Sequence, residues 1–350
     1  MLPATLAVSL ALALPAAAQD EPPRSSSEAV AQPKTPAPSP GEIVAAAPAA
    51  DWVAIAPADL LVMTLAPERD PGSGAGAGGN QRQVTIQLMP PPFSQGWVGN
   101  IRKLAAAHWW DGLAITRVQD NYVVQWGDPE AEDKAKAKAL PSGLAALNDQ
   151  PYEVKGVALR FPKLDRKAGS VSWRMVQPCI PSSSAACDRD SYAEGAGFVK
   201  GWPIAGTSAE HWPVHCYGMV GVGRNYSPDT GSGAELYVVI GHAPRHLDRN
   251  IALVGRVVEG IEHLSSLPRG TGALGFYEKP EQRVPIVSIR LASELPAAEQ
   301  PRFEYLSTES ESFARYADAR ANRRDPFFIV PAGGADICNI PVPVRRVAGK

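Results

Sequence analysis

The sequence lacks any strong excess of charge and any long run of basic residues. Its 34 Lys and Arg residues nearly balance its 36 Asp and Glu residues, which leaves a formal net charge of −2. A protein that binds nucleic acid normally carries a basic patch or a basic stripe with interleaved aromatic residues. Neither feature is present in this chain, so we expect no nucleic-acid partner.

The chain also lacks the usual patterns of a metal site. It contains six histidines and four cysteines, and no Cys-x-x-Cys pair occurs. His211 lies close in sequence to His215 and Cys216, and His242 lies close to His246. Neither group has an acidic partner at a spacing typical of metal ligands. We therefore expect neither a metal nor a cofactor.

The cysteines are few but even in number, namely Cys179, Cys187, Cys216 and Cys338. In an oxidising compartment they can form two disulfides, with three possible connectivities. Cys179 and Cys187 enclose the polar stretch PSSSAA, which suits a local bridge. Cys216 with Cys338 would then tie the C-terminus to the main domain.

No apolar run at the N-terminus is long enough for a typical membrane span. Residues 2–18 are small and apolar, and three alanines ending at Ala18 precede Gln19, which is the A-x-A pattern of a secretory signal peptide. The run lacks a flanking Lys or Arg, and an uncleaved anchor is the alternative, although the stretch is short and weakly apolar for one. We expect residues 1–18 to be removed on export to the periplasm, no stable membrane insertion afterwards, and a monomer.

Residues 19–55 are rich in Pro, Ala and Ser, and up to about residue 50 they hold almost no large apolar side chains. Such a segment cannot bury a core, so the sequence predicts a disordered linker.

The pattern changes after this linker. Residues 60–65 and 83–88 are typical of two paired strands. The glycine-rich stretch PGSGAGAGGN between them is interpreted as a hairpin connection, because no helix or Lys-Ser/Thr follows it.

The folded part is predicted to contain many short strands and few helices. Helices are expected at 97–107 and 260–267, the first with an apolar face. Further strands are expected near 113–118, 122–125, 156–161, 170–175, 235–240, 251–258 and 285–291. Short strands separated by turn signals favour a β-barrel or a β-sandwich.

The composition changes again after residue 294. Thr308 and Glu311 have the spacing of a capping box for a helix over about 309–322. The run Phe327–Val330 is strongly apolar and is predicted to be a strand or docking segment that needs burial. We expect this tail to pack on the barrel.

One arginine stands out in the segment HWWDGLAITRVQDNYVVQWGD, residues 108–128. Arg117 lies there among tryptophans, a tyrosine and branched aliphatic residues. Arginine is rarely buried unless it is paired, so Arg117 is either a salt-bridged strand residue or a functional group. The segment holds no Ser/His/Asp set and no cysteine nucleophile. In an enzyme, Arg117 would therefore act by hydrogen bonding and electrostatics beside an apolar pocket.

This segment resembles the first half of a cyclophilin-type peptidyl-prolyl cis-trans isomerase. The family pattern F-H-R-V-I-x-x-F-M-I-Q-G-G-D corresponds to I-T-R-V-Q-D-N-Y-V-V-Q-W-G-D at 115–128. GSGAELYVVIG at 231–241 is similar to the family's G-S-Q-F-F-I strand. HLDRNIALVGRVVEGIEHLSSL at 246–267 is similar to its W-L-D-G-x-x-V-F-G-x-V-x-x-G stretch. The resemblance covers roughly 83–128 and 218–291, in the family's order.

The resemblance implies a mainly β fold, a closed eight-stranded antiparallel cyclophilin-like barrel capped by two helices. The cyclophilin-like domain would span 56–293, with an insertion at about 129–215, and a helical extension would follow at 294–350. The implied activity is the isomerisation of X–Pro bonds in proline-containing polypeptides of the cell envelope, without a cofactor. The alternative is a catalytically weak module that binds proline-containing segments.

The resemblance also implies a site. Arg117 matches the catalytic arginine, and Tyr122 and Tyr237 match two pocket phenylalanines, although ordinary core packing is the alternative for both tyrosines. Glu235 replaces a substrate-binding glutamine, and Ile251 replaces a histidine found in many members. The implied substrate-binding residues are Tyr122, Val123, Gln125, Glu235, Tyr237, His246, Leu247 and Ile251.

Overall fold

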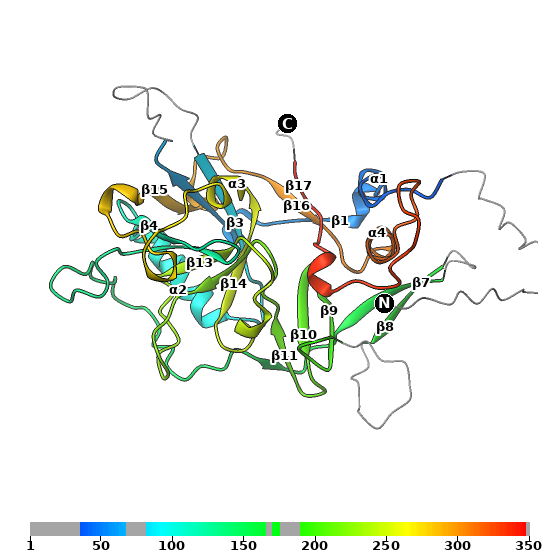
Figure 1. The fold of residues 1–350 in the computed structure, drawn as a ribbon, viewed down its shortest axis with the longest axis horizontal. Helices are drawn as coiled ribbons and strands as arrows, with labels where there is room; N and C mark the ends of the chain where they lie inside the picture. Colours follow the sequence, from blue (N-terminus) through cyan, green and yellow to red (C-terminus); the bar gives the residue numbers. More distant parts are fainter. Residues whose placement is uncertain (1–35, 68–81, 166–169, 176–189, 348–350) are drawn as a thin grey trace, which may run out of the picture. The chain divides into compact units, whose positions relative to one another are not determined.

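The computed structural model describes residues 36–67, 82–165, 170–175 and 190–347, and a closed β-barrel forms its largest sheet (Figure 1). The barrel strands are β2 (Leu60–Leu65), β3 (Arg82–Leu88), β4 (Ala114–Val118), β5 (Val123–Gly127), β12 (Met219–Val222), β13 (Leu236–Val239), β14 (Leu253–Glu259) and β15 (Val284–Leu291). They close in the order β12-β13-β5-β4-β15-β2-β3-β14, and every neighbouring pair is antiparallel. The predicted eight-stranded antiparallel barrel is confirmed.

Strand β2 is buried along its whole length and is apolar except for Thr64, because both of its faces are covered. Leu61, Met63 and Leu65 point into the main core with residues of β3 and β15. Leu60 and Val62 face the other way and join a second cluster that includes Phe303. A strand with two covered faces shows no alternation of polar and apolar residues.

Two helices pack on the barrel. Helix α2 (Gln95–Ala106) contacts β14 and β15, and it buries the apolar face predicted from the sequence. Helix α3 (Glu262–Ser265) contacts β3 and is shorter than the predicted helix at 260–267. Among the described residues, no helix combines the length and apolar character needed to cross a bilayer.

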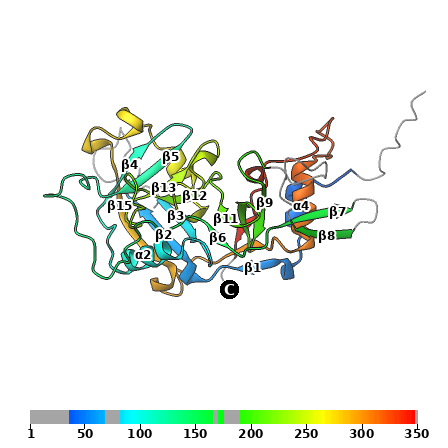
Figure 2. The same cartoon turned by 90° about the horizontal axis from the view of Figure 1, so that it is seen from below.

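The insertion folds into a separate antiparallel sheet (Figure 2). Its strands are β6 (Val154–Lys155), β7 (Arg160–Asp165), β8 (Ser170–Met175), β9 (Gly195–Val199), β10 (Trp202–Gly206) and β11 (Glu210–Pro213), in the order β6-β11-β10-β9-β7-β8. The sequence predicted two of these strands. It missed the β9–β10 hairpin, whose two-residue turn places Lys200 at φ 47° and Gly201 at φ 82°. Positive φ at both positions is typical of a type I′ turn.

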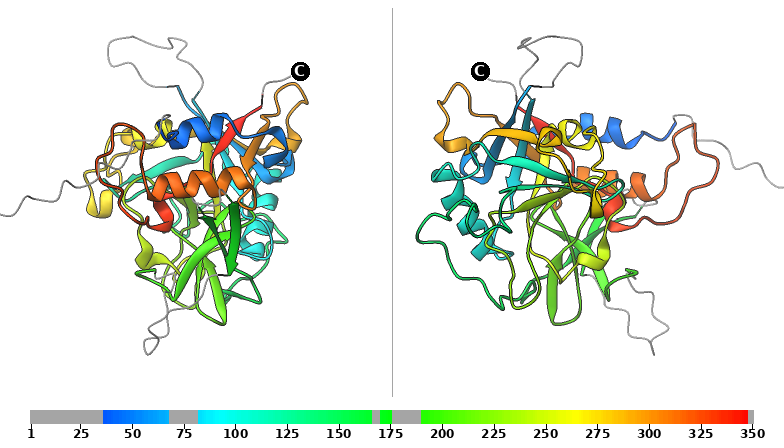
Figure 3. Two further views of the ribbon diagram at one scale, coloured as in Figure 1. Left: turned by 90° about the vertical axis from the view of Figure 1, so that its right-hand side faces the viewer. Right: turned by 60° about the vertical axis from the view of Figure 1, so that its left-hand side comes forward.

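Segments from both ends of the chain complete the fold. The strands β1 (Trp52–Ala54), β16 (Phe303–Leu306) and β17 (Val344–Arg346) form a three-stranded sheet in the order β1-β16-β17. The helices α1 (Pro40–Ala45) and α4 (Glu311–Ala321) lie side by side (Figure 3). The linker prediction for 19–55 is therefore wrong from Pro40 onward. Ser39 and Glu42 form a capping box that stabilises the start of α1, and tertiary contacts bury Trp52. The overall composition of the segment predicts neither effect.

The C-terminal extension also differs from its prediction. Ser310, not Thr308, caps α4 by accepting from the backbone N–H of Phe313. Helix α4 contacts β7 of the insertion sheet, and its Phe313 ring meets Phe198 of the neighbouring strand β9 edge-on at 4.9 Å between centroids. The tail thus packs on the insertion as well as on the outer face of β2.

The apolar run at 327–330 is not buried. Phe327, Ile329 and Val330 are 85%, 96% and 79% exposed, so the prediction that they need burial is wrong. These residues lie in a stretch without helix or strand, where exposed side chains make too few contacts to be covered.

The predicted bridge between Cys216 and Cys338 is present and joins the extension to the segment before β12. The predicted bridge between Cys179 and Cys187, the signal peptide at 1–18 and the glycine-rich stretch at 71–80 all lie outside the described residues.

Candidate active site

Arg117 lies on β4 opposite Gln125 of β5, and pairing of the two strands brings their side chains together. An Nη atom of Arg117 donates to Oε1 of Gln125 at 3.1 Å. The other Nη donates to the side-chain oxygen of Gln119, and Nε donates to the carbonyl oxygen of Leu274 at 2.7 Å. These contacts fix the guanidinium from three sides.

Glu235 of the loop before β13 sets the orientation of Gln125. Nε2 of Gln125 donates to Oε1 of Glu235 at 2.6 Å. A carboxylate only accepts, so the amide nitrogen must face Glu235 and the amide oxygen must face Arg117. Burial raises the pKa of Glu235 above its ordinary value, and the hydrogen bond from Gln125 opposes that rise.

The guanidinium of Arg117 has N–H donors that its contacts with the described residues do not use. Arginine carries five N–H groups, and contacts with the described residues use one on Nε and one on each Nη. Each Nη therefore retains one N–H. Burial lowers the pKa of Arg117, while Tyr122 and Glu235 raise it, and the side chain is half-buried. A partly dehydrated cation with two available donors is suited to hydrogen-bond a substrate carbonyl or amide.

A segment far along the chain covers one side of this arginine. Phe276 pairs with Arg117 in an isolated antiparallel bridge, and its ring centroid lies 5.3 Å from the guanidinium carbon. Leu274 holds a φ of 56°, an uncommon value for a residue other than glycine, and its carbonyl accepts from Arg117. The Tyr122 ring lies on another side at 5.7 Å.

A cavity of about 130 Å³, with polar as well as apolar walls, opens beside Arg117, and we call it the apolar cavity after the aromatic and aliphatic side chains on one side of it. Val123 and Tyr237 are buried there, and Tyr122, Leu247 and Ile251 are partly buried around them. The cavity is lined by Arg117, Tyr122, Val123, Gln125, Gly223, Arg224, Tyr237, Leu247 and Ile251. Its size and lining suit a small apolar ring.

A second, larger cavity of about 630 Å³ continues from the first. The two share Arg117, Gln125, Arg224 and Ile251. The larger one has the charged side chains of Glu235 and Arg283 on its walls. Together the cavities form a groove with a small apolar pocket on one side of Arg117.

A family comparison explains this arrangement. The profile described as cyclophilin type peptidyl-prolyl cis-trans isomerase/CLD matches residues 83–291, which is more than half of the 350-residue chain. The chain belongs to this cyclophilin family. The reaction of the family is the cis-trans isomerisation of X–Pro peptide bonds.

A solved structure agrees with the cyclophilin fold. The chain is similar to the cyclophilin AquaCyp293 from Hirschia baltica, with a TM-score of 0.55 and 20% identity over 85% of this chain and 94% of that one. A cyclophilin type isomerase from Cryptosporidium parvum, solved in the presence of the dipeptide Ala-Pro, matches with a TM-score of 0.33 and 10% identity over 60% and 92% of the two chains. A search of the curated proteins finds no matching sequence.

The structure of this cyclophilin brings most of the predicted site residues together. Arg117, Tyr122, Val123, Gln125, Tyr237, Leu247 and Ile251 all line the small cavity, and Glu235 lines the larger one. His246 lines neither cavity and is exposed, and its ring stacks on Tyr122 at 6.2 Å between centroids. His246 can thus act on a substrate only from the rim or through Tyr122.

Sequence reasoning missed Gln119, Arg224, Leu274 and Phe276. The sequence could have predicted Gln119, because a residue two positions after Arg117 lies on the same side of an extended chain. The others come from loops whose length and conformation follow no periodic pattern. Leu274 is 157 residues from Arg117 in sequence.

Two of the residues considered as metal ligands are engaged in other contacts. His215 lies between Asp248 and Tyr237, and Cys216 is in a disulfide. In the described part of the chain, no group of three or more His, Cys, Asp or Glu side chains is arranged to hold a metal ion.

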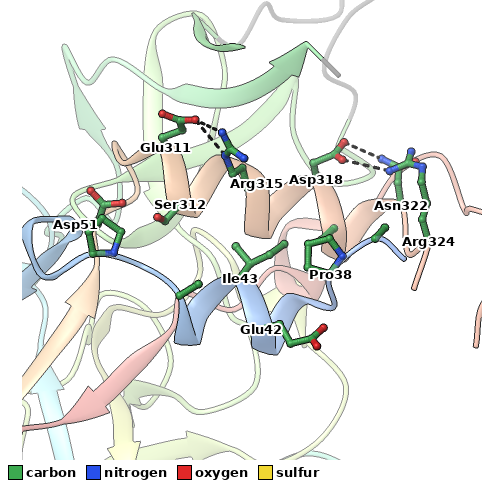
Figure 4. A pocket seen from close by; sticks show the side chains of 14 residues that line it. Pro38, Glu42, Ile43, Asp51, Glu311, Ser312, Arg315, Asp318, Asn322 and Arg324 are labelled. Atoms are coloured by element: carbon green, nitrogen blue, oxygen red, sulfur yellow. Dashed lines mark hydrogen bonds and ion pairs between the residues drawn. The ribbon is translucent and has the colours of Figure 1, made fainter. Parts of the chain in front are cut away.

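A further cavity, of about 650 Å³, lies between α1 and α4 (Figure 4). Ile43 and Pro38 face the polar surface of α4 there, and Arg315 is paired with Glu311. This cavity contains none of the predicted site residues, so we do not place the active site in it.

Proposed function

We propose that Arg117 is the catalytic residue of this isomerase and that the small apolar cavity holds the substrate proline ring. Rotation about an X–Pro bond has a barrier of about 18–20 kcal/mol, because the amide C–N bond has partial double-bond character. No nucleophile is needed. A hydrogen bond to the prolyl nitrogen favours the twisted state, in which that nitrogen regains its lone pair.

The two donors of Arg117 that its contacts with the described residues leave unused support this proposal most directly. They belong to a guanidinium that is already fixed by Gln125, Gln119 and Leu274. A fixed donor needs no reorganisation as the amide twists, which is the condition for electrostatic stabilisation of a transition state. Val123 and Tyr237 would hold the ring while the preceding residue turns.

Glu235 acts in this proposal as a positioning residue. Its carboxylate orients Gln125, and Gln125 in turn orients Arg117. Its negative charge also stabilises the positive charge of the half-buried guanidinium. Glu235, which stands where the family has a glutamine, thus keeps Arg117 in place. It also adds a negative charge to the wall of the groove that faces the substrate.

A pair of matched peptides tests the proposal. We expect the wild-type protein to accelerate cis-trans exchange of a short Ala–Pro peptide, measured by exchange NMR without a protease. We expect weaker binding of the matched Ala–Ala peptide, which cannot fill the apolar cavity. Binding of the Ala–Pro peptide without faster exchange would favour the alternative, a module that only binds proline-containing segments.

We also propose that the protein acts on exported polypeptides in the periplasm. The small apolar run ending at Ala18 supports export, and the Cys216–Cys338 bridge suits an oxidising compartment. Protein from the osmotic-shock fraction of the producing bacterium should begin at Gln19 by N-terminal sequencing. Recovery of a chain beginning at Met1 from the cytoplasm would contradict this proposal.

A further inference from the structure

Behind the apolar cavity lies a chain of buried polar groups that the proposed reaction does not use. Nε2 of His215 lies 2.9 Å from the hydroxyl of Tyr237, and Nδ1 of His215 lies 2.8 Å from Oδ1 of Asp248. The His215 and Asp248 side chains are 1% and 5% exposed. The imidazole also stacks on the Tyr237 ring, with 9° between the planes.

The contacts fix the direction of each hydrogen bond. Asp248 accepts from the backbone N–H of His215 at 3.0 Å as well as from the ring. A carboxylate cannot donate, so Nδ1 of His215 carries the hydrogen. Burial lowers the pKa of His215 against the opposing effect of Asp248, which favours the neutral ring. Its Nε2 is then an acceptor, and the Tyr237 hydroxyl donates to it.

A glycine on the neighbouring strand leaves space for the Tyr237 hydroxyl. Gly221 on β12 is the register partner of Tyr237. A Cβ atom at Gly221 would lie 2.3 Å from the Tyr237 hydroxyl oxygen, so only glycine leaves room for it. A phenylalanine, which the family resemblance places at this position, would have no group to donate to His215.

The other end of the polar chain reaches the second wall of the cavity. Oδ2 of Asp248 accepts from Nε of Arg245 at 2.6 Å. Arg245 begins the short 3-10 helix Arg245–Leu247, and Leu247 lines the cavity together with Tyr237. His215 and Asp248 thus connect two walls of one pocket.

Arg245 also extends the connection outside the barrel. Its two Nη atoms donate to Asp190 of the insertion at 3.1 Å and 2.9 Å. Asp336 of the C-terminal extension lies 3.8 Å from it. Asp336 is two residues before Cys338, which is bonded to Cys216, the neighbour of His215.

We infer that His215 is a positioning residue, which holds Tyr237 and, through Asp248, Leu247 in the geometry that receives a proline ring. The inference rests on the proposed function of the apolar cavity. In this arrangement the insertion and the extension preform the pocket from behind. A pocket whose walls are not fixed must order them when the substrate binds, so the loss of His215 acts on KM more than on kcat.

The test compares His215→Leu with the double variant His215→Leu/Tyr237→Phe on an Ala–Pro peptide. We expect the single variant to lower kcat/KM by about tenfold, mainly by raising KM, because the Tyr237 hydroxyl loses its acceptor. The double variant should return to within about threefold of wild type, since a phenyl ring needs no partner. The matched control is His211→Leu, a buried histidine on β11 outside the pocket, which should leave KM unchanged.

The outcomes separate this inference from the proposed function. An unchanged KM in His215→Leu, or a double variant as impaired as the single one, overturns the role of His215 while wild-type activity still stands. Inactivity of the wild type instead refutes the proposed function. If His215→Leu does not fold, the ¹⁵N spectrum of the wild type decides. Addition of the Ala–Pro peptide should shift the His215 Nε2 resonance, and no shift would overturn the inference.

Discussion

Replacing Arg117 with alanine is expected to lower kcat/KM for X–Pro isomerisation by about 10²–10³-fold, the usual cost of removing one preorganised donor from a transition state. The loss should fall mainly on kcat, because the apolar cavity that holds the proline ring remains. Exchange NMR on an Ala–Pro peptide measures both parameters.

Two further variants define the cause of that loss. Arg117→Lys keeps the charge but replaces the planar fork with a single ammonium group, so it should recover little activity. Arg315→Ala removes an exposed arginine that pairs with Glu311 on α4, and it should leave kcat/KM unchanged. If Arg117→Ala isomerises the peptide as fast as wild type, Arg117 is a structural strand residue and the catalytic assignment is wrong.

The part of the site that sequence alone predicted is the part that strand pairing creates. Arg117 and Gln125 lie opposite each other because β4 and β5 form a hairpin, which a local pattern can indicate. The contact of Gln125 with Glu235 follows from the pairing of β5 with β13, two segments that both resemble the family. The barrel was predictable for the same reason.

The parts that sequence did not predict depend on contacts without a local signal. Leu274 reaches Arg117 through a left-handed backbone conformation, which an apolar residue rarely adopts. Helix α1 lies in a stretch whose composition suits a linker, and its packing against α4 joins the two ends of the fold. Propensity is a weak predictor when such tertiary contacts decide the outcome.

His215 shows how the same residue types can suggest a different chemistry. Because His215 is adjacent to Cys216 in the sequence, we considered the two as metal ligands. In the fold its ring nitrogens face a carboxylate and a phenol on separate segments, and Cys216 points to the C-terminal extension. Spacing along the chain could not distinguish these arrangements, because both partners of His215 come from residues after 230.

The Cys216–Cys338 bridge is expected to give the largest single contribution to stability. It joins residues 122 positions apart, and a cross-link that closes about 100 residues restricts the unfolded chain by about 4–5 kcal/mol in the chain-entropy account. The double variant Cys216→Ala/Cys338→Ala should therefore lower the free energy of unfolding by about 3–5 kcal/mol, measured by urea denaturation.

The slope of that denaturation curve identifies the mechanism. Without the cross-link the unfolded chain expands and exposes more surface, so the m-value should rise as the midpoint falls. A loss of local packing alone would lower the midpoint at an unchanged m-value. Ile340→Ala is the matched control, because it removes buried side-chain volume next to the bridge but leaves the cross-link intact. A double variant with the stability and m-value of wild type would contradict the expected restriction of the unfolded chain.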